Sequence, residues 1–561
     1  MPDSHASKEL LNCFEYIKRY HTDMLDSIAI MLELFWLKRH STPLIESLII
    51  LANKRKPIYD TFSQALQETF GSELYTPLNP NANLLKILKV IHTQTITNRT
   101  IEEFLHIITQ KKTTHRLFSY STPLEINELL VGILDIKETE SVYNPCYGMG
   151  SLFFAIHNHA KNVELYGEEL ESTLAKIAKI TCKILHLNPQ HLVLNNILTN
   201  AQFKHHKFDK IICNPPLDSH VGTQFLKEDE RFASYETLIK TYPELLFLIH
   251  SLSYLKDKGV FILRTQTLLK SSLEGRLREK LCEDRLIEAI IELPKNILPH
   301  QTHDFSIIVL SQNNDSILHI NANTPHFYQK DGKYNRIIHL NALLELYKQK
   351  ATSEYSCLTP IEQINPHDLS VGHYLHKPKQ ELANGLCLKD LQVNIFRGQR
   401  VYGSQKDEKI TFFDLGVADF AEFGFCDEFS TQRFKGDTIK IGKYALKPYD
   451  IAISIRGNTP KFTILSPNAA KHTIVANAGI VILRAPSKDI AIGIYCYLFS
   501  HNGQRALGNI YERLGGLSPN DLENLLIPRD FTQKSQKTFD KIQDYALKLR
   551  EIESQLKKLR D

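Results

Sequence analysis

Apolar residues follow different patterns in different parts of this 561-residue chain. In about the first 110 residues they recur every three or four positions, as Leu10, Phe14 and Ile17 do, which predicts amphipathic helices. Beyond this region, short apolar runs alternate with helical stretches. The alternation favours an α/β fold, a mostly parallel sheet with helices on both faces. The runs expected to form its strands are ESVYNPC, VELYGEE, HLVLNN, FDKIICNPP, KGVFILRTQ, LIEAIIELP and FSIIVLSQ.

Another pattern begins near residue 385, where short strand-like runs are separated by glycines and turns. This texture predicts an α+β domain. The chain then ends in a long amphipathic helix with charges between its apolar positions, which could pack on a partner helix or on its own domain. The apolar positions of this helix are Phe539, Ile542, Ala546, Leu549, Ile552, Leu556 and Leu559.

These changes of pattern divide the chain into parts of different expected structure. We expect an N-terminal helical domain (1–112), an α/β domain of Rossmann-like topology (113–345), a connector (346–380), an α+β domain (381–530) and a terminal helix (531–561).

The composition is that of an ordinary globular protein, with 42% hydrophobic residues. No apolar run reaches the roughly 18 residues that a membrane helix needs, and the first residues lack the order of a signal peptide. The nine cysteines show no CxxC spacing, which argues against a metal site or a disulfide framework and for a reducing cytoplasm. The net charge of +4 permits binding to nucleic acid without demanding it.

A glycine loop follows the first predicted strand, in SVYNPCYGMGSLFFAIHNHA. Gly148 and Gly150 stand between a strand and an apolar helix, where the backbone can approach a ligand closely or simply form a tight turn. The next predicted strand ends in Glu168 and Glu169, and an acid there can either accept hydrogen bonds from ribose hydroxyls or be solvated in a loop. Together these features favour a nucleoside cofactor, and the lack of a third glycine argues against NAD.

The fourth predicted strand runs into Asn214, Pro215 and Pro216, in FDKIICNPPLDSH. Each proline fixes its own φ and restricts the residue before it, so the Asn214 side chain is held rigidly beyond the strand end. Its amide carbonyl and the Pro215 carbonyl would present two acceptors to one exocyclic amino group. Such acceptors draw the nitrogen lone pair out of conjugation, so the amine can attack a methyl sulfonium without a general base. The alternative for these three residues is a strand-terminating turn.

The run YSTP…NPCYGMG…LYGEELE…NNILTN…FDKIICNPP resembles the adenine-N6 DNA methyltransferases, and among them the modification subunits of type I restriction–modification systems. The resemblance implies a Rossmann-like class I methyltransferase domain that uses S-adenosyl-L-methionine. The cofactor-binding residues that it implies are Thr122, Pro123, Asn144, Gly148, Gly150, Glu169 and Asn196. The catalytic residues that it implies are Asn214, Pro215, Pro216 and Leu217.

Two positions depart from the pattern of this family. The family has an Asp where this chain has Asn144, so a negative charge near a cationic cofactor is lost unless Glu168 or another acid compensates. Leu217 replaces an aromatic residue that stacks on the flipped adenine, and such stacking is worth about 1–3 kcal/mol per base. We expect productive binding to fall by about ten- to a hundredfold. Other rings could stack instead, and the candidates are Phe232, Tyr235 and Tyr242.

Residues 381–530 resemble a target-recognition domain from the specificity subunits of the same systems, and the terminal helix resembles their spacer helices. The runs that carry this resemblance are LKDLQVNIFRG, LKPYDIAISIRGN, IVANAGIVILRA and LGGLSPNDLENLLIP. The resemblance implies double-stranded DNA as a partner, a homodimer formed through the C-terminal helix, and a separate restriction subunit. The candidates for contact with DNA are Arg397, Arg400, Arg456 and Lys461.

The sequence therefore predicts an adenine-specific, site-specific DNA methyltransferase that acts on N6 of a flipped-out adenine. It would be the modification component of a restriction–modification or related defence system. One alternative, suggested by Asn144 and Leu217, is a catalytically degenerate methyltransferase-like protein that binds DNA as a scaffold or sensor. Another alternative is methylation of RNA or of a protein glutamine, since Asn-Pro-Pro sites also serve those acceptors.

Overall fold

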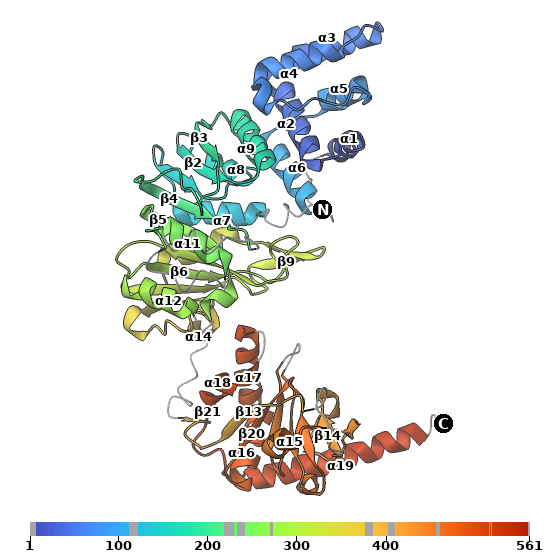
Figure 1. Ribbon diagram of the computed structural model, residues 1–561, viewed down its shortest axis with the longest axis vertical. Helices are drawn as coiled ribbons and strands as arrows, with labels where there is room; N and C mark the ends of the chain where they lie inside the picture. Colours follow the sequence, from blue (N-terminus) through green and yellow to red (C-terminus); the bar gives the residue numbers. More distant parts are fainter. Residues whose placement is uncertain are drawn as a thin grey trace. The chain divides into compact units, whose positions relative to one another are not determined.

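The chain folds into two compact units, residues 1–375 and 376–561, which are described separately. The computed structural model (Figure 1) describes residues 7–110, 122–217, 229–232, 242–269, 273–375, 385–401, 410–434, 436–455, 460–514, 517 and 519–558. In this part of the chain, every helix is too short or too polar to cross a lipid bilayer.

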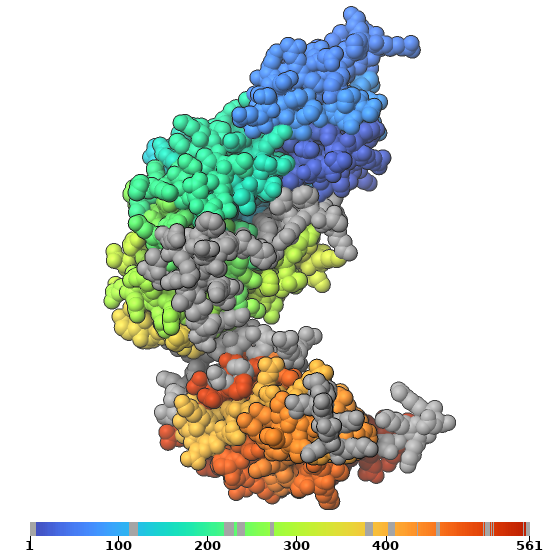
Figure 2. Space-filling view, in the orientation of Figure 1, coloured from blue at the N-terminus to red at the C-terminus, as the bar shows by residue number. Residues whose placement is uncertain are grey.

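The first unit begins with the helices that the apolar spacing predicted. They are α1 (Lys8–Lys18), α2 (Met24–His40), α3 (Thr42–Asn53), α4 (Tyr59–Leu74), α5 (Leu84–Thr93) and α6 (Asn98–Gln110). Helix α2 is buried on nearly all sides, as expected for a helix that is apolar around its circumference. Their core is continuous with that of the following sheet, and Figure 2 shows the blue helical part packed directly against the teal sheet part.

A nine-stranded sheet forms the centre of the first unit, with the strand order β3-β2-β1-β4-β5-β7-β6-β8-β11. Strands β1 to β5 pair in parallel, and β7 is antiparallel to both of its neighbours. The strands are β1 (Ser141–Asn144), β2 (Glu164–Glu169), β3 (His191–Leu194), β4 (Phe208–Cys213), β5 (Leu255–Arg264), β6 (Ile287–Glu292), β7 (Phe305–Leu310), β8 (Ser316–Asn321) and β11 (Ser356–Pro360). This arrangement is the class I methyltransferase fold, which confirms the predicted fold class.

Helices cover both faces of the sheet because its strands are apolar on both sides. In β1, Val142 belongs to the core on one face and Tyr143 to the core on the other, as the alternation of side chains along a strand requires. The first face is covered by α7 (Leu124–Leu134), α8 (Leu152–His159), α9 (Ser172–Leu185) and α13 (Leu340–Gln349). The second is covered by α11 (Pro243–Leu252), α12 (Leu273–Glu283) and α14 (Val371–Leu375).

The segment expected to be a connector contributes to this unit. Strand β11 pairs antiparallel with β8, so residues 356–360 form an edge of the sheet and α14 packs nearby. A hairpin of β9 (Tyr328–Asp331) and β10 (Tyr334–Ile337) precedes them. Pro360, at the end of β11, fits an edge position because proline cannot donate a hydrogen bond to a further strand.

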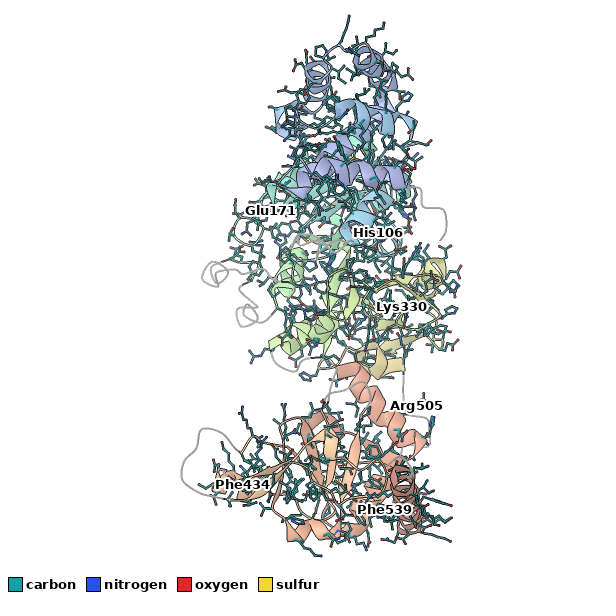
Figure 3. The ribbon with its side chains drawn as sticks, turned by 90° about the vertical axis from the view of Figure 1, so that its right-hand side faces the viewer. His106, Glu171, Lys330, Phe434, Arg505 and Phe539 are labelled. Carbon is teal, nitrogen blue, oxygen red and sulfur yellow. The ribbon has the colours of Figure 1, made fainter. Side chains whose placement is uncertain are left out.

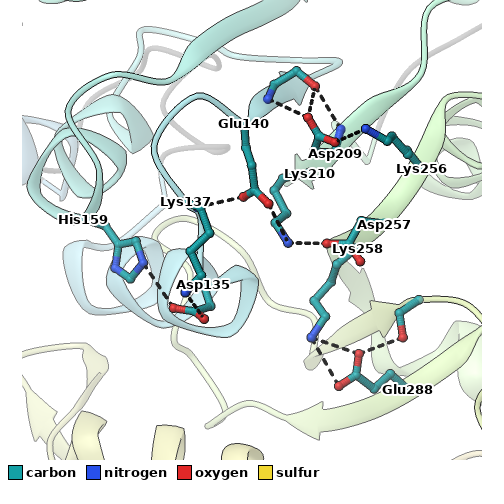
Figure 4. Close-up of polar contacts among 12 residues, drawn as sticks. Asp135, Lys137, Glu140, His159, Asp209, Lys210, Lys256, Asp257, Lys258 and Glu288 are labelled. Carbon is teal, nitrogen blue, oxygen red and sulfur yellow. Dashed lines mark hydrogen bonds and ion pairs between the residues drawn. The ribbon is translucent and has the colours of Figure 1, made fainter.

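Charged side chains connect β1, β4 and β5 at the end of the sheet where these strands begin (Figure 4). Lys256 Nζ lies 2.6 Å from Asp209 Oδ1, and the Ser141 hydroxyl donates to the other carboxylate oxygen at 2.8 Å. Burial would raise the pKa of Asp209, but these hydrogen bonds lower it to about 2. Lys210 is buried between Glu140 and Asp257. These contacts hold the strands in register at this end of the sheet. The loops that follow β1, β2, β3 and β4 leave from the opposite end.

The second unit contains a five-stranded sheet with the order β13-β20-β17-β18-β15 and a three-stranded sheet with the order β16-β14-β19. A short antiparallel pair joins the beginning of this unit to a segment near its C-terminal helix, and its strands are β12 (Leu386–Cys387) and β21 (Leu526–Ile527). The other strands are β13 (Asn394–Arg397), β14 (Phe412–Leu415), β15 (Phe425–Cys426), β16 (Gln432–Arg433), β17 (Ile451–Ser454), β18 (Phe462–Leu465), β19 (Ile474–Ala476) and β20 (Ile480–Arg484). The helices are α15 (Thr438–Tyr444), α16 (Lys488–Phe499), α17 (His501–Leu514), α18 (Pro519–Glu523) and α19 (Ser535–Lys558).

Candidate functional site

The predicted site residues of the first unit gather where β1, β2, β3 and β4 end. Strands β1 and β4 are neighbours, so the loops that follow them begin side by side. From there the chain continues in opposite directions, from β1 toward β2 and from β4 toward β5. Open parallel sheets bind their ligands at such a switch in strand order. The structure therefore places the glycine loop and the Asn-Pro-Pro motif side by side, and Cys146 Sγ lies 3.4 Å from the backbone oxygen of Asn214.

Each polar and glycine position of the loop after β1 has a defined local role. Asn144 Oδ1 accepts a hydrogen bond from the Cys146 N–H at 3.0 Å, which closes the turn. Gly148 and Gly150 have φ values of +56° and +79°, which side chains disfavour. A Cβ on Gly150 would meet the Phe153 ring at 2.7 Å, whereas a Cβ on Gly148 would meet nothing within 4 Å. Gly148 thus borders open space, and Gly150 allows the loop to pack on α8.

The two acids at the end of β2 have different environments. Glu169 Oε2 accepts from the Gly148 N–H at 2.8 Å, and Oε1 accepts from the N–H groups of Leu170 and Glu171 at 2.9 and 3.0 Å. Burial raises the pKa of Glu169, and the three N–H donors oppose that rise. Glu168 is fully buried on the other side of the strand, so it is not a solvated loop acid. Of the two carboxylates, that of Glu169 is the one that contacts the glycine loop.

Asn214 is held by a residue far away in the sequence. Its Nδ2 donates to Thr122 Oγ1 at 2.8 Å, and Thr122 is followed by Pro123, the N-cap of α7. This hydrogen bond directs the amide nitrogen toward Thr122 and therefore turns the amide oxygen, Oδ1, away from it. Pro215 is buried and Pro216 is half-buried. The structure thus joins Thr122 and Pro123, the described part of the predicted YSTP motif, to the Asn-Pro-Pro motif.

Three described side chains that were expected to stack on a flipped base, or to replace that stacking, lie in the protein core. Leu217 is 7% exposed and belongs to the large core of the helices and sheet. Phe232 is fully buried, and Tyr242 is 7% exposed beneath the Arg264 guanidinium, 4.5 Å from its ring centroid. Tyr235 lies outside the described residues. In this structure, therefore, none of the three described side chains presents an open face to a ligand.

Asn196 lies in the turn after β3, next to the strand that carries Glu169. Its Oδ1 accepts from the Leu198 N–H at 3.1 Å, and the N–H of Asn195 donates to the backbone oxygen of Glu169 at 2.7 Å. The turn is thus attached to the end of β2, as a position near the cofactor would require.

A pocket beside Thr122 contains an acid that the sequence analysis did not identify. The pocket is lined by Glu102, Leu105, His106, Thr109, Thr122, Leu124, Met149, Ser151 and Phe154. Glu102 is 3% exposed, and its Oε1 has no hydrogen-bond partner among the described residues. Burial raises the pKa of Glu102 to about 7. In Figure 3 the neighbouring His106, one turn further along α6, marks this region. In the sequence, the signal for this pocket was an acid at a position within the apolar stripe of a predicted helix.

Two of the candidate DNA contacts, Arg397 and Lys461, lie at one end of the larger sheet of the second unit. Arg397 at the end of β13 aligns across the sheet with Val481, Ile453 and Phe462, and Lys461 directly precedes Phe462. Arg397 and Lys461 are exposed, as is Arg400. Arg456 lies outside the described residues. The register therefore brings Arg397 and Lys461 to the same end of the sheet.

The chain belongs to the N-6 DNA Methylase family, which matches residues 97–382, just over half of its length. It is 26% identical over 301 residues to the type I restriction enzyme MjaVII methylase subunit of Methanocaldococcus jannaschii, covering 48% of this chain and 51% of that protein. It is 25% identical over 329 residues to the MpnII methylase subunit of Mycoplasma pneumoniae, covering 53% and 59%. The chain thus spans about half the length of the curated relatives that it matches.

Two solved structures share the fold. The type I restriction–modification methyltransferase subunit from Streptococcus thermophilus aligns with a TM-score of 0.53 at 17% identity, over 65% of this chain and 98% of that one. The type IIG restriction endonuclease BpuSI aligns with a TM-score of 0.50 at 14% identity, over 94% of this chain and 75% of that one. At these identities, the likeness concerns the fold alone.

Proposed function

We propose that this protein is a sequence-specific DNA methyltransferase that transfers a methyl group from S-adenosyl-L-methionine to N6 of a flipped-out adenine. The hydrogen bond between Asn214 and Thr122 carries the proposal, because it orients a rigid amide at the edge where the glycine loop and Glu169 also lie. The type I methylase subunits among its relatives support a role as the modification component of a restriction–modification or related defence system.

The cofactor would lie along the ends of β1, β2 and β3. S-adenosyl-L-methionine supplies an electrophilic methyl group. Glu169, already oriented by three backbone N–H groups, would accept a hydrogen bond from a ribose hydroxyl with the lone pair of Oε2 that remains. Gly148 would allow close approach of the backbone, and Asn196 would lie near the adenine ring of the cofactor. Asn144, Gly150 and Pro123 would shape the loops around it.

Glu102 would supply the negative charge that Asn144 lacks. Glu102 lines the pocket together with Thr122 and the glycine-loop residue Met149. Its Oε2 lies 3.4 Å from Arg99 Nη1, and its Oε1 is buried without a partner among the described residues. A cationic ammonium group there would pair with this oxygen, and pairing with a buried acid favours its charged form. We therefore assign the methionine end of the cofactor to this pocket.

Catalysis would depend on two acceptors and would need no general base before the attack. Asn214 Oδ1 and the Pro215 carbonyl would accept the two N–H bonds of the adenine amino group, which localises the nitrogen lone pair for attack on the methyl group. The C–S bond would break to release S-adenosylhomocysteine, and the methylated nitrogen would then lose one proton to water. Pro216 restricts Pro215, and Thr122 restricts Asn214. With Leu217 in the core, the base would be held mainly by these acceptors, so we expect turnover below that of relatives with an aromatic residue at this position.

The second unit would recognise the target sequence in double-stranded DNA. Arg397 and Lys461 at one edge of its sheet, with Arg400 and Arg456 nearby in the sequence, would contact phosphates or bases. We propose a homodimer through α19, which would place two such units on the half-sites of a symmetric target, and a separate restriction subunit for cleavage.

The second candidate function is a methyltransferase-like scaffold or sensor that binds DNA without turnover. The burial of Leu217, Phe232 and Tyr242 favours it, because none of these side chains is open for stacking on a flipped base. Methylation of RNA or a protein glutamine is a further candidate, which the basic edge of the second unit disfavours.

Methyl transfer from labelled S-adenosyl-L-methionine to unmethylated genomic DNA tests these candidates. We expect incorporation with the wild-type protein and with Asn53→Ala, an exposed asparagine on α3, and none with Asn214→Ala. Cofactor and DNA binding without incorporation would favour the scaffold. Incorporation into RNA or protein that survives deletion of residues 380–561 would favour the other acceptors.

A further inference from the structure

Helix α15 of the second unit presents a large apolar side chain to solvent. Ile439 is 85% exposed, more than any other large apolar side chain in the described part of the chain. Phe434, just before the helix, is 64% exposed, and in Figure 3 it lies on the opposite side of the second unit from Phe539 of α19. A single exposed isoleucine is ordinary, so the residues around it decide whether this surface binds a ligand.

The fold uses the inner face of α15. Ile441 is buried in a small core that includes Val401, and the Asp437 N–H donates to the Val401 backbone oxygen at 2.8 Å. The Asp437 side chain caps the helix by accepting from the Lys440 N–H at 3.1 Å. These contacts attach the start of the helix to the end of the segment that follows β13.

The outer face of α15 contains residues that the fold does not require. Ile439, Gly442 and Lys443 are three or four residues apart, so they lie on one side of the helix, away from Ile441, and all three are exposed. A Cβ on Gly442 would meet nothing within 4 Å, and its φ is not positive, so neither space nor backbone explains this glycine. Glycine and isoleucine are also weaker helix formers than alanine. We call Ile439, Gly442 and Lys443 the α15 face.

Positive charge surrounds the α15 face. Arg397 and Arg400 are exposed in the segment after β13, whose end contacts the start of the helix. Residues 394–401 and 432–444 contain a single acid, Asp437, and its carboxylate already caps α15. A polyanion therefore fits this surface better than an acidic or an uncharged partner does.

We propose that the α15 face reads the target sequence in the major groove of double-stranded DNA, with Ile439 against the C5 methyl group of a thymine. This inference rests on the proposed recognition of DNA by the second unit and assigns that recognition to particular side chains. Gly442 lets a base edge or a sugar come close to the helix backbone, and Lys443 donates to a phosphate or a guanine.

The dimensions of the two grooves select the major one. It is roughly 12 Å wide and admits an α-helix, whose diameter with side chains is about 10–12 Å. The minor groove is about 6 Å wide, which is too narrow for a helix, and it exposes no thymine methyl group. An exposed isoleucine on a helix therefore finds its apolar partner in the major groove.

Selection of bound duplexes from a random-sequence pool of double-stranded DNA tests the α15 face without turnover. With the full-length wild-type protein, we expect one recurrent motif. Ile439→Ala should lower the preference for thymine at one position of that motif by about fourfold, because one buried methyl group contributes about that factor. Ile50→Ala, the same change at an exposed isoleucine of α3, should select an unchanged motif.

Replacement of thymine by uracil tests the contact itself, because uracil differs from thymine by the absence of the C5 methyl group. At one position of the selected duplex, uracil should weaken binding of the wild-type protein by about fourfold. The same uracil should leave binding of Ile439→Ala unchanged. Equal weakening of both proteins at every thymine would overturn the assignment of Ile439.

Gly442→Ala separates recognition from folding. Alanine is the better helix former and its Cβ meets open space, so urea unfolding should show equal or higher stability. Affinity for the selected duplex should nevertheless fall by about five- to a hundredfold, because a methyl group is forced into a close contact. The matched control is Gly508→Ala, at a helical glycine of α17 that also borders open space, which should bind as the wild type does.

Failure of the α15 face as a reader of DNA is distinguishable from failure of the proposed function. If the wild-type protein selects a motif, and Ile439→Ala and Gly442→Ala bind it equally well, the α15 face serves a protein partner instead and the inference is overturned. If the wild-type protein selects no motif, the inference fails together with the proposed recognition of DNA. A motif that responds to these variants in a protein without methyl transfer would support the inference and the scaffold.

Discussion

Asn214 and Thr122 lie 92 residues apart in the sequence, yet their side chains meet at 2.8 Å. Neither motif alone distinguishes a functional asparagine from one that only ends a strand. The contact matters because an amide has two chemically different ends, and the Thr122 hydroxyl determines which end turns toward it. The direction of the Asn214 oxygen, on which the proposed chemistry depends, is thus set by a second residue.

Removal of the Thr122 hydroxyl should therefore reduce turnover. Thr122→Val keeps the shape but leaves the Asn214 amide without this acceptor, and one hydrogen bond of this kind contributes about 0.5–1.5 kcal/mol. We expect kcat to fall by about three- to tenfold. Thr122→Ser keeps the hydroxyl and should remain close to wild type. Steady-state kinetics that show equal kcat for Thr122→Val and wild type would contradict this role.

Glu169 should control cofactor affinity through its two oxygens. Glu169→Gln replaces one oxygen by an amino group, which would face an N–H donor of Gly148 or of Leu170 and Glu171. Hydrogen bonds to a charged group are worth about 1.5–3 kcal/mol, so we expect binding of S-adenosyl-L-methionine to weaken by at least about tenfold. Titration calorimetry measures this. The control is Glu171→Gln, an exposed acid labelled in Figure 3, which should bind normally.

At the residue scale, the sequence predicts which side chains would form the site, but not which contacts hold them. Gly148, Glu169 and Asn214 were identified because each follows a recognisable strand. Glu102 was not, because Thr122 and Met149, which line a pocket with it, are distant in the sequence. The role expected for Leu217 also depended on the exposure of its side chain, which the sequence does not reveal.

At the scale of elements, the predicted helices and central strands are present because their apolar periods are strong. Helix α2 and strands β4 and β5 have long apolar runs bounded by polar or turn residues. The edge strand β11 was harder to predict, since it has five residues and ends in a proline. Edge strands have weak local signals, because pairing with a distant strand defines them.

Helix α2 contains an acid whose burial makes stability depend on pH. Glu33 is fully buried, its Oε1 accepts from the Thr76 N–H at 2.8 Å, and burial raises its pKa to about 8. Because the folded state holds this proton more tightly than the unfolded state, the contribution of Glu33 is full below about pH 4 and is lost as the pH rises to about 8.

Glu33→Gln should remove this dependence, because it keeps an acceptor for Thr76 and carries no charge. Relative to wild type, we expect the variant to gain about 1 kcal/mol of unfolding free energy per pH unit between pH 5 and 8. Urea unfolding at several pH values measures this gain. Glu73→Gln, at an exposed position of α4, should show no such gain. Parallel stability curves for Glu33→Gln and wild type would contradict the assignment.

At the scale of the whole molecule, α19 is divided between two environments. Phe539, Ile542 and Ala546 are buried against the rest of the second unit, whereas Leu549, Ile552 and Leu556 are 41–57% exposed. The last apolar position of the predicted helix, Leu559, lies outside the described residues. The sequence predicted the amphipathic helix, but only the structure shows which half already has an apolar neighbour.

The exposed half of α19 should mediate dimerisation. In a dimer, these three large apolar side chains would be buried against a second copy of the helix. Each would contribute about 1.5–3 kcal/mol to the free energy of association when fully buried. We expect a dimer in sedimentation equilibrium and a monomer for Leu549→Glu combined with Ile552→Glu. Gln555→Glu, an exposed polar position of the same helix, should leave the dimer intact. A monomeric wild-type protein at micromolar concentration would contradict this interface.

The central claim is that Asn214 directs methyl transfer to adenine N6 at a defined DNA sequence. Its most direct test is single-molecule mapping of modified bases in the genome of cells that express either the wild-type protein or Asn214→Ala. We expect N6-methyladenine at one recurrent motif with the wild type and at none with the variant, at equal protein levels. An unmodified genome in both strains, or methylation that persists with Asn214→Ala, would contradict it.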